Sequence, residues 1–119
     1  MNERVLVVDD SVTMRQMLVT ILSDAGYDPV AAADGEEALA LLTADTCLVI
    51  ADYTMPKMDG AELIRRIRSG TVARTVPTVV ITTEHAQEKM EHGKNAGATA
   101  WITKPFGEEE LLKTMRRVL

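Results

Sequence analysis

The chain has 119 residues, of which 46% are hydrophobic and 26% charged, and its formal net charge is -5. This length suffices for one domain with its own core and is too short for two, so we expect residues 1–119 to fold as a single domain. The proportions of hydrophobic and charged residues argue against disorder. The net negative charge argues against nucleic-acid binding, which needs a concentrated positive field. No apolar run approaches the roughly 20 residues that span a bilayer, and the first residues do not resemble a signal sequence. We therefore expect a cytoplasmic protein without membrane contact.

Short apolar runs rich in β-branched residues predict four buried strands, and a weaker run predicts a fifth. In chain order these segments are 5–8, 29–31 (the weaker run), 47–51, 78–81 and 100–102. Near-continuous apolar strands are typical of a parallel sheet that is covered on both faces.

The segments between these strands carry apolar residues at helical spacing. The clearest helix carries a single stripe, after which Gly26 is a plausible C-terminal cap; the stripe consists of Met14, Met17, Leu18, Ile21, Leu22 and Ala25. Segment 85–96 has only a thin apolar face. The other three helices are predicted from Ala38, Leu39 and Leu42, from Leu63, Ile64 and Ile67, and from Leu111, Leu112, Met115, Val118 and Leu119.

Alternating strands and helices predict an α/β fold with a doubly wound, five-stranded parallel sheet and five helices on its two faces. The expected strand order is 2-1-3-4-5, as in flavodoxin-like proteins. In such sheets ligands bind beyond the carboxyl ends of strands 1 and 3.

Polar side chains follow four of the predicted strands at those ends: Asp9, Asp10, Asp52, Thr82, Thr83 and Lys104. Two carboxylates 4 Å apart repel by roughly 4 kcal/mol at an effective dielectric constant of 20, so a cluster of them requires a cation or a proton. Oxygen ligands without a nearby histidine or cysteine favour Mg²⁺, for which Mn²⁺ can substitute. We expect Asp10 and Asp52 to be direct ligands and Asp9 to act through water.

A carboxylate beside a metal can attack phosphorus, as in aspartyl-phosphate enzymes. Phosphoryl transfer then needs a cation and a hydroxyl donor next to the nucleophile. These considerations predict Asp52 as the phosphoacceptor, with Lys104 and Thr82 beside it. Thr83 is the alternative hydroxyl.

Four segments, VLVVDDS, IADYTMPKMDG, VVITTE and ITKPF, occur in this order along the chain. Together they resemble the signature segments of the response-regulator receiver domain. The resemblance implies that Asp9, Asp10, Asp52 and the backbone carbonyl of Thr54 bind Mg²⁺. It also implies that Thr82 is a switch hydroxyl, Trp101 a rotating aromatic residue and Lys104 the invariant lysine.

The family resemblance also implies partners. The phosphodonor would be a histidine kinase, and the chain would be a signalling phosphoacceptor rather than an enzyme, although it takes part in its own phosphorylation and slow dephosphorylation. The segment DDSVTMRQ and Trp101 resemble the stand-alone regulators of chemotaxis. The target would then bind the face made by the fourth helix, fifth strand and fifth helix, and a flagellar motor switch protein is one such target.

Other functions remain open at this point. The chain could serve another phosphorelay, act as a phosphate sink, or be a docking module that does not respond to phosphate. A small-molecule module of the flavodoxin type is a different class, but it would need a phosphate-binding loop where this chain has DDS. A Mg²⁺-dependent phosphohydrolase would need additional residues for a substrate pocket.

Overall fold

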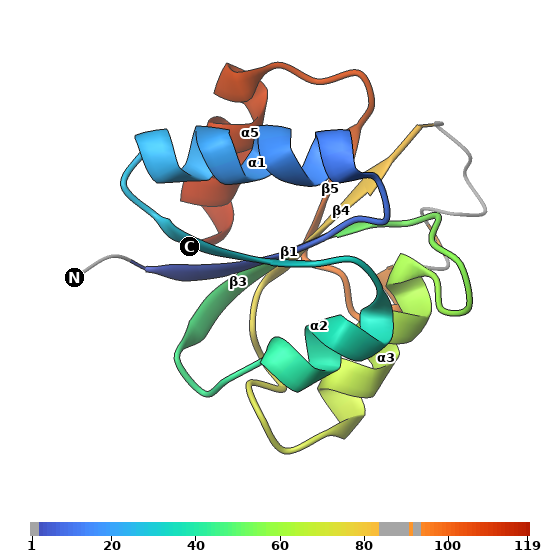
Figure 1. Ribbon diagram of the computed structural model, residues 1–119. Helices are drawn as coiled ribbons and strands as arrows, with labels where there is room; N and C mark the ends of the chain where they lie inside the picture. Colours follow the sequence, from blue (N-terminus) through green and yellow to red (C-terminus); the bar gives the residue numbers. More distant parts are fainter. Residues whose placement is uncertain (1–2, 84–90, 92–93) are drawn as a thin grey trace.

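The computed structural model describes residues 3–83, 91 and 94–119. Its five strands form one sheet in the order β2-β1-β3-β4-β5, and all neighbouring pairs are parallel (Figure 1). This confirms the predicted fold class and strand order. In chain order the elements are β1 (Arg4–Val8), α1 (Val12–Asp24), β2 (Asp28–Ala32), α2 (Gly35–Leu41), β3 (Thr46–Asp52), α3 (Gly60–Ser69), β4 (Thr78–Thr82), β5 (Ala100–Thr103) and α5 (Glu108–Val118).

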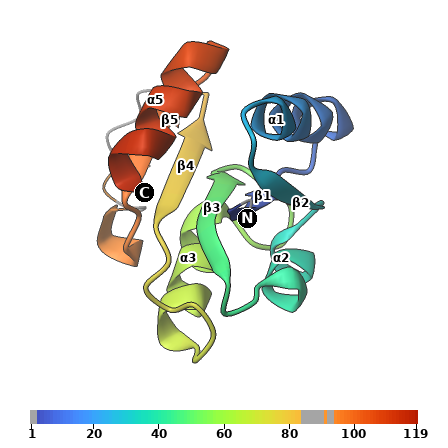
Figure 2. The ribbon, with the colours of Figure 1, turned by 90° about the vertical axis from the view of Figure 1, so that its left-hand side faces the viewer.

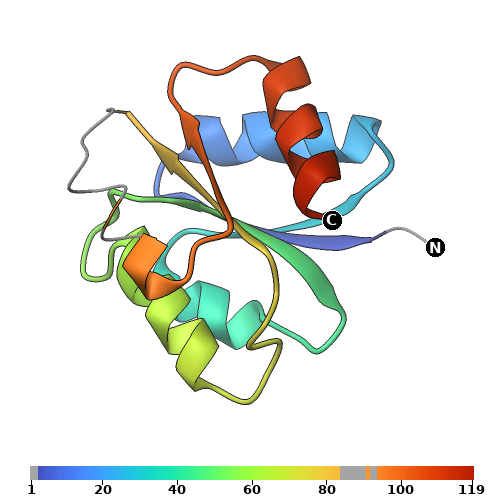
Figure 3. The ribbon, with the colours of Figure 1, turned by 180° about the vertical axis from the view of Figure 1, so that it is seen from behind.

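The helices cover both faces of the sheet. Helices α1 and α5 lie on one face, and α2 and α3 lie on the other (Figures 1 and 2). Seen from behind, α5 lies in front of α1 on the same face of the sheet (Figure 3). The helix predicted over 85–96 falls largely on residues outside the described ones. No helix in the described part of the chain is long and apolar enough to cross a membrane.

Side-chain alternation along the strands divides the core between the two faces. The α1 and α5 side includes Val5, Val7, Ile50, Ile81, Leu22 and Leu111. The α2 and α3 side includes Leu6, Val8, Val49, Ala51, Leu63 and Ile67. Strand β2 is at one edge of the sheet and its first four residues are not buried, which explains its weaker apolar signal.

Helix α1 begins at the cap residue Ser11, whose side chain accepts a hydrogen bond from the Met14 backbone N–H at 3.2 Å. Leu18 and Leu22 are buried, but Met17 is 39% exposed. The prediction that Met17 belongs to the buried stripe was therefore wrong, because α1 contacts the sheet through a narrower face. Gly26 follows the helix with φ +93°, a conformation that glycine adopts without steric cost.

Replacing Leu22 by Ala is expected to lower the free energy of unfolding by about 3 kcal/mol, because the side chain is fully buried and a cavity would remain. Met17→Ala in the same helix is the matched control and should cost less than about 1 kcal/mol. Urea unfolding followed by circular dichroism measures both values. Equal losses would show that the two residues are buried alike.

Candidate functional site

Three carboxylates meet at the carboxyl ends of β1 and β3. Asp9 and Asp10 follow β1, Asp52 is the last residue of β3, and one oxygen of each lies within 4.8 Å of the others. Parallel pairing of β1 with β3, which sets Val8 opposite Ala51, brings these positions together. Asp9 is 1% exposed and Asp52 is 7% exposed, whereas Asp10 is open to solvent. The site therefore combines two buried acidic groups with one at its mouth.

The backbone after β1 holds Asp9 in place. Its Oδ1 accepts a hydrogen bond from the Ser11 N–H at 2.9 Å, and its carbonyl accepts one from Nη1 of Arg15 at 2.6 Å. Its Oδ2 is buried without a hydrogen-bond partner among the described residues. A buried carboxylate oxygen in this condition is costly unless a cation binds it.

Lys104 provides positive charge from the other side of the site. Its Nζ lies 3.4 Å from Oδ1 of Asp52 and 3.8 Å from Oδ2 of Asp9, and its side chain is 18% exposed. Its backbone N–H donates to the Thr82 carbonyl at 2.7 Å, which ties the residue to the end of β4. The peptide bond between Lys104 and Pro105 is cis. The Lys104 ammonium group thus pairs with both buried carboxylates of the site.

Burial raises the pKa of both Asp9 and Asp52. For Asp52 the neighbouring charge of Asp9 raises it further, while Lys104 and the Thr54 backbone N–H act in the opposite direction. For Asp9 the hydrogen bond from Ser11 and the charge of Lys104 lower the pKa but do not outweigh burial. The site is therefore short of positive charge, and its oxygen ligands fit a hard divalent cation such as Mg²⁺.

Thr82 and Thr83 differ in position. Thr82 is the last residue of β4 and only 3% exposed, whereas Thr83 is exposed. Asp52 pairs with Ile81, so Thr82 stands one residue beyond Asp52 on the adjacent strand. The burial of Thr82 favours it as the hydroxyl that faces the interior.

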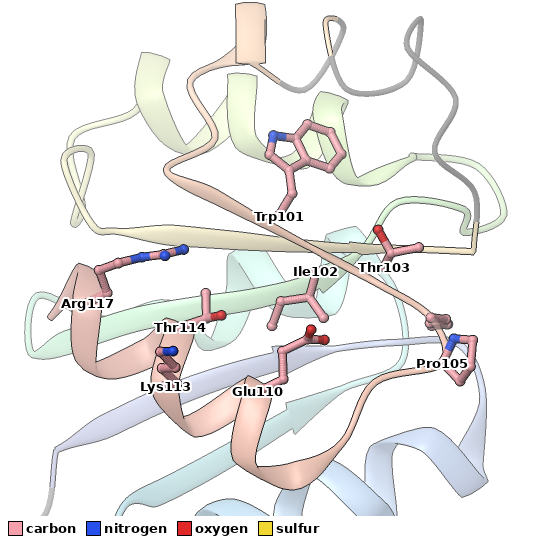
Figure 4. A pocket seen from close by; sticks show the side chains of 9 residues that line it. Trp101, Ile102, Thr103, Pro105, Glu110, Lys113, Thr114 and Arg117 are labelled. Carbon is pink, nitrogen blue, oxygen red and sulfur yellow. The ribbon is translucent and has the colours of Figure 1, made fainter.

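Trp101 lies in β5, away from the acidic cluster. Its half-buried ring packs against a small apolar group, which consists of Ala61, Ile64, Val80 and Ala96. Figure 4 shows Trp101 and Ile102 on opposite sides of the strand, with Ile102 directed toward α5. A pocket of about 600 Å³ lies between β5 and α5 and is lined by Trp101, Ile102, Thr103, Lys104, Pro105, Glu110, Lys113, Thr114 and Arg117. Lys104 thus lines both the acidic site and this pocket.

Sequence reasoning missed two residues that shape the site. Arg15 binds the Asp9 carbonyl from the first turn of α1, and its spacing from the DD pair is the only signal in the sequence. Gly60 is the last residue of the segment IADYTMPKMDG, but the sequence alone assigned it no role of its own. A Cβ at Gly60 would lie 2.7 Å from the carbonyl oxygen of Asp52, so a side chain there would displace the end of β3.

The fold and this site define a class of protein. A family model for the response regulator receiver domain matches residues 5–116, and the chain belongs to this family. The CheY1 chemotaxis protein of Helicobacter pylori is 38% identical over 119 residues, which cover 98% of this chain and 96% of that protein.

Solved structures show the same likeness. The chemotaxis protein CheY4 of Vibrio cholerae superposes with a TM-score of 0.95 and is 45% identical, with 100% of both chains covered. The receiver domain of a sensor histidine kinase from Pseudomonas aeruginosa has a TM-score of 0.89 and 26% identity, with 99% of this chain and 98% of that one covered. That structure has a magnesium ion coordinated in its active site cleft.

Removing one buried charge should stabilise the metal-free protein. Because the folded-state pKa of Asp9 is raised above its ordinary value of 3.8, ionisation of Asp9 weakens the fold as the pH rises through the raised pKa. Asp9→Asn is therefore expected to increase the free energy of unfolding by about 1 kcal/mol at pH 7 in EDTA. The gain should shrink as the pH falls below the raised pKa, because Asp9 of the folded wild-type protein is then protonated and neutral, like the asparagine of the variant.

Urea unfolding between pH 4 and 8 measures this difference. The control is Asp28→Asn, an exposed position at the opposite end of the sheet. A loss of stability in Asp9→Asn at pH 7 would contradict the view that repulsion and burial outweigh the attraction of Lys104.

Proposed function

We propose that residues 1–119 act as a single receiver domain that accepts a phosphoryl group on Asp52 in a Mg²⁺-dependent reaction. The observation that carries this proposal is the meeting of three carboxylates within 4.8 Å with Lys104 Nζ 3.4 Å from Asp52. Membership of the receiver family supports it. The same membership disfavours a small-molecule module of the flavodoxin type.

The metal site would consist of Asp9, Asp10, Asp52 and the backbone carbonyl of Thr54, and Mn²⁺ could replace Mg²⁺. When bound, the ion neutralises the carboxylates and the oxygens of the incoming phosphoryl group. The Oδ2 of Asp9, which is buried without a hydrogen bond among the described residues and only 3.8 Å from Lys104 Nζ, supports a cation here. The magnesium ion in the related Pseudomonas receiver structure supports its identity.

The residues of the chain would carry out the transfer together. A carboxylate oxygen of Asp52 forms a bond to phosphorus as the phosphorus–nitrogen bond of a kinase phosphohistidine breaks. Lys104, already paired with Asp52, binds an oxygen of the transferred group, and Thr82 donates its hydroxyl to another. The chain is in this view a signalling phosphoacceptor and not an enzyme, although its own groups promote both phosphorylation and slow dephosphorylation.

The signal would leave through the face made by the fourth helix, β5 and α5. Phosphorylation replaces the Asp52 carboxylate with a group of roughly -1.5 to -2 charge, whose oxygens draw Thr82 and Lys104 toward Asp52. Trp101 then rotates into the space that Thr82 leaves. The pocket beside Trp101 carries charged α5 residues suited to a protein target, namely Glu110, Lys113 and Arg117.

Chemotaxis is the pathway that the relatives favour, since chemotaxis proteins match nearly all of this chain. A cytoplasmic location and a flagellar motor switch protein as target belong to the same proposal. The alternative within the family is a receiver that serves another phosphorelay or a phosphate sink.

Phosphate uptake tests the nucleophile. Incubation with a panel of radiolabelled histidine kinases and Mg²⁺ should label the wild-type chain, because Asp52 and Lys104 are already paired for attack. Asp52→Asn and addition of EDTA should each reduce labelling to background. Asp45→Asn, an exposed carboxylate before β3, is the control and should label normally. Labelling of Asp52→Asn at the wild-type level would refute the assignment.

The fluorescence of Trp101, the single tryptophan of the chain, tests the switch. Mg²⁺ followed by beryllofluoride should change it in the wild type. Thr82→Ala should retain the response to Mg²⁺ but lose most of the response to beryllofluoride, because the buried hydroxyl is gone. The exposed neighbour is the matched control, and Thr83→Ala should behave as wild type. Equal effects of the two substitutions would contradict the role of Thr82.

A further inference from the structure

Arg68, near the end of α3, joins three segments of the chain. Its Nη1 donates to the Arg74 carbonyl at 2.9 Å, and its Nη2 donates to the Gly97 carbonyl at 2.9 Å and to Oγ1 of Thr78 at 3.4 Å. Burial lowers the pKa of its guanidinium. These three acceptors are neutral oxygens on separate segments, and the forked guanidinium of an arginine can reach them together.

The absence of a side chain at Gly97 leaves room for Arg68. Its φ is +105°, and a Cβ added there would lie 3.1 Å from Nε and 3.3 Å from Cγ of Arg68. The stem of Arg68 therefore lies directly on the Gly97 backbone. A side chain at position 97 would both strain the backbone and push Arg68 away.

The same segment is fixed to the start of β4. The Thr78 N–H donates to Oγ1 of Thr99 at 3.0 Å, and the Thr99 N–H donates to the Thr78 carbonyl at 2.9 Å. Thr78 is fully buried. Arg68 thus binds residues 97–99 at a point where they are already paired with the sheet.

One face of α3 reaches from this contact to Trp101. Ala61, Ile64 and Arg68 follow one another at helical spacings of three and four residues, so they share that face. Ala61 and Ile64 are in the apolar group against which Trp101 packs. Gly97 and Trp101 are four residues apart, and both are in contact with the same side of α3.

We propose that Arg68 is a positioning residue: it holds residues 97–99 on α3 and thereby keeps Trp101 in its half-buried place against Ala61 and Ile64. The contact lies at the first residue of β4, whereas the acidic site lies beyond the last. The proposal about Arg68 therefore concerns the resting position of Trp101. The proposed function is needed only for the further step, in which the position of Trp101 affects the face that binds the target.

Acrylamide quenching of Trp101 fluorescence in the folded, metal-free protein tests this. Arg68→Gln and Gly97→Ala break the same contact from its two sides, and each should raise the quenching constant about two- to threefold. Arg68→Lys should give a smaller rise, because an ammonium group replaces only part of the fork. The double variant should not exceed the larger single effect, since both changes remove one interaction.

The matched control is Arg66→Gln, on the same helix, whose side chain is 54% exposed and paired with Glu62. It should leave quenching unchanged. Urea unfolding followed by circular dichroism confirms that each variant is folded. Should Arg68→Gln fail to fold, Arg68→Lys and Gly97→Ala still decide the matter.

Lowered stability with wild-type quenching in both Arg68→Gln and Gly97→Ala would overturn the proposal, because the contact would then be structural only. A rise in Arg68→Gln with none in Gly97→Ala would overturn it as well, since lost charge alone would explain the result. Mg²⁺ titration is run in parallel and should give the same affinity in every variant. Absence of Mg²⁺ binding in the wild type would count against the proposed function and not against the role of Arg68.

Discussion

Repulsion among three carboxylates at one edge of the sheet is the interaction around which the site is arranged. Asp9 and Asp52 are buried, and Lys104 supplies a single positive charge to both. The raised pKa values of the two buried groups show that this compensation is incomplete. Two buried carboxylates thus share too little positive charge, and such a pair favours a bound divalent cation.

The doubly wound topology determines which strands lie next to this charge. Order β2-β1-β3-β4-β5 sets the ends of β1 and β3 side by side, and places β4 and β5 next along the edge. The backbone bond from Lys104 to Thr82 then joins the ammonium group to the strand that carries the proposed switch hydroxyl. In the proposed function, a charge change at Asp52 would act first on β4 and on β5, the strand that contains Trp101.

The two ends of β4 have different roles in this arrangement. The carboxyl end is part of a polar site with incomplete charge balance, whereas the amino end is held by Thr99 and, through its hydroxyl, by Arg68. Trp101 lies on β5 between these ends, opposite Val80. If the proposed switch operates, it would change the carboxyl end of β4, while the contacts at the amino end keep the strands in register.

The sequence by itself predicted the strand order from its apolar runs and the family from four motif segments, because both are local signals, and the sheet and the family model confirm them. It also predicted that Asp9, Asp10, Asp52 and Lys104 lie together at one edge of the sheet, as they do. It overestimated the buried stripe of α1 at Met17, and it had no local pattern for Arg15, Gly60 or Arg68. Those residues act through contacts with backbone that is distant in space or sequence, as when Gly60 meets the Asp52 carbonyl and Arg68 meets Gly97. Only the tertiary structure decided these contacts, since chain folding and not residue type selects which backbone groups come within hydrogen-bonding distance.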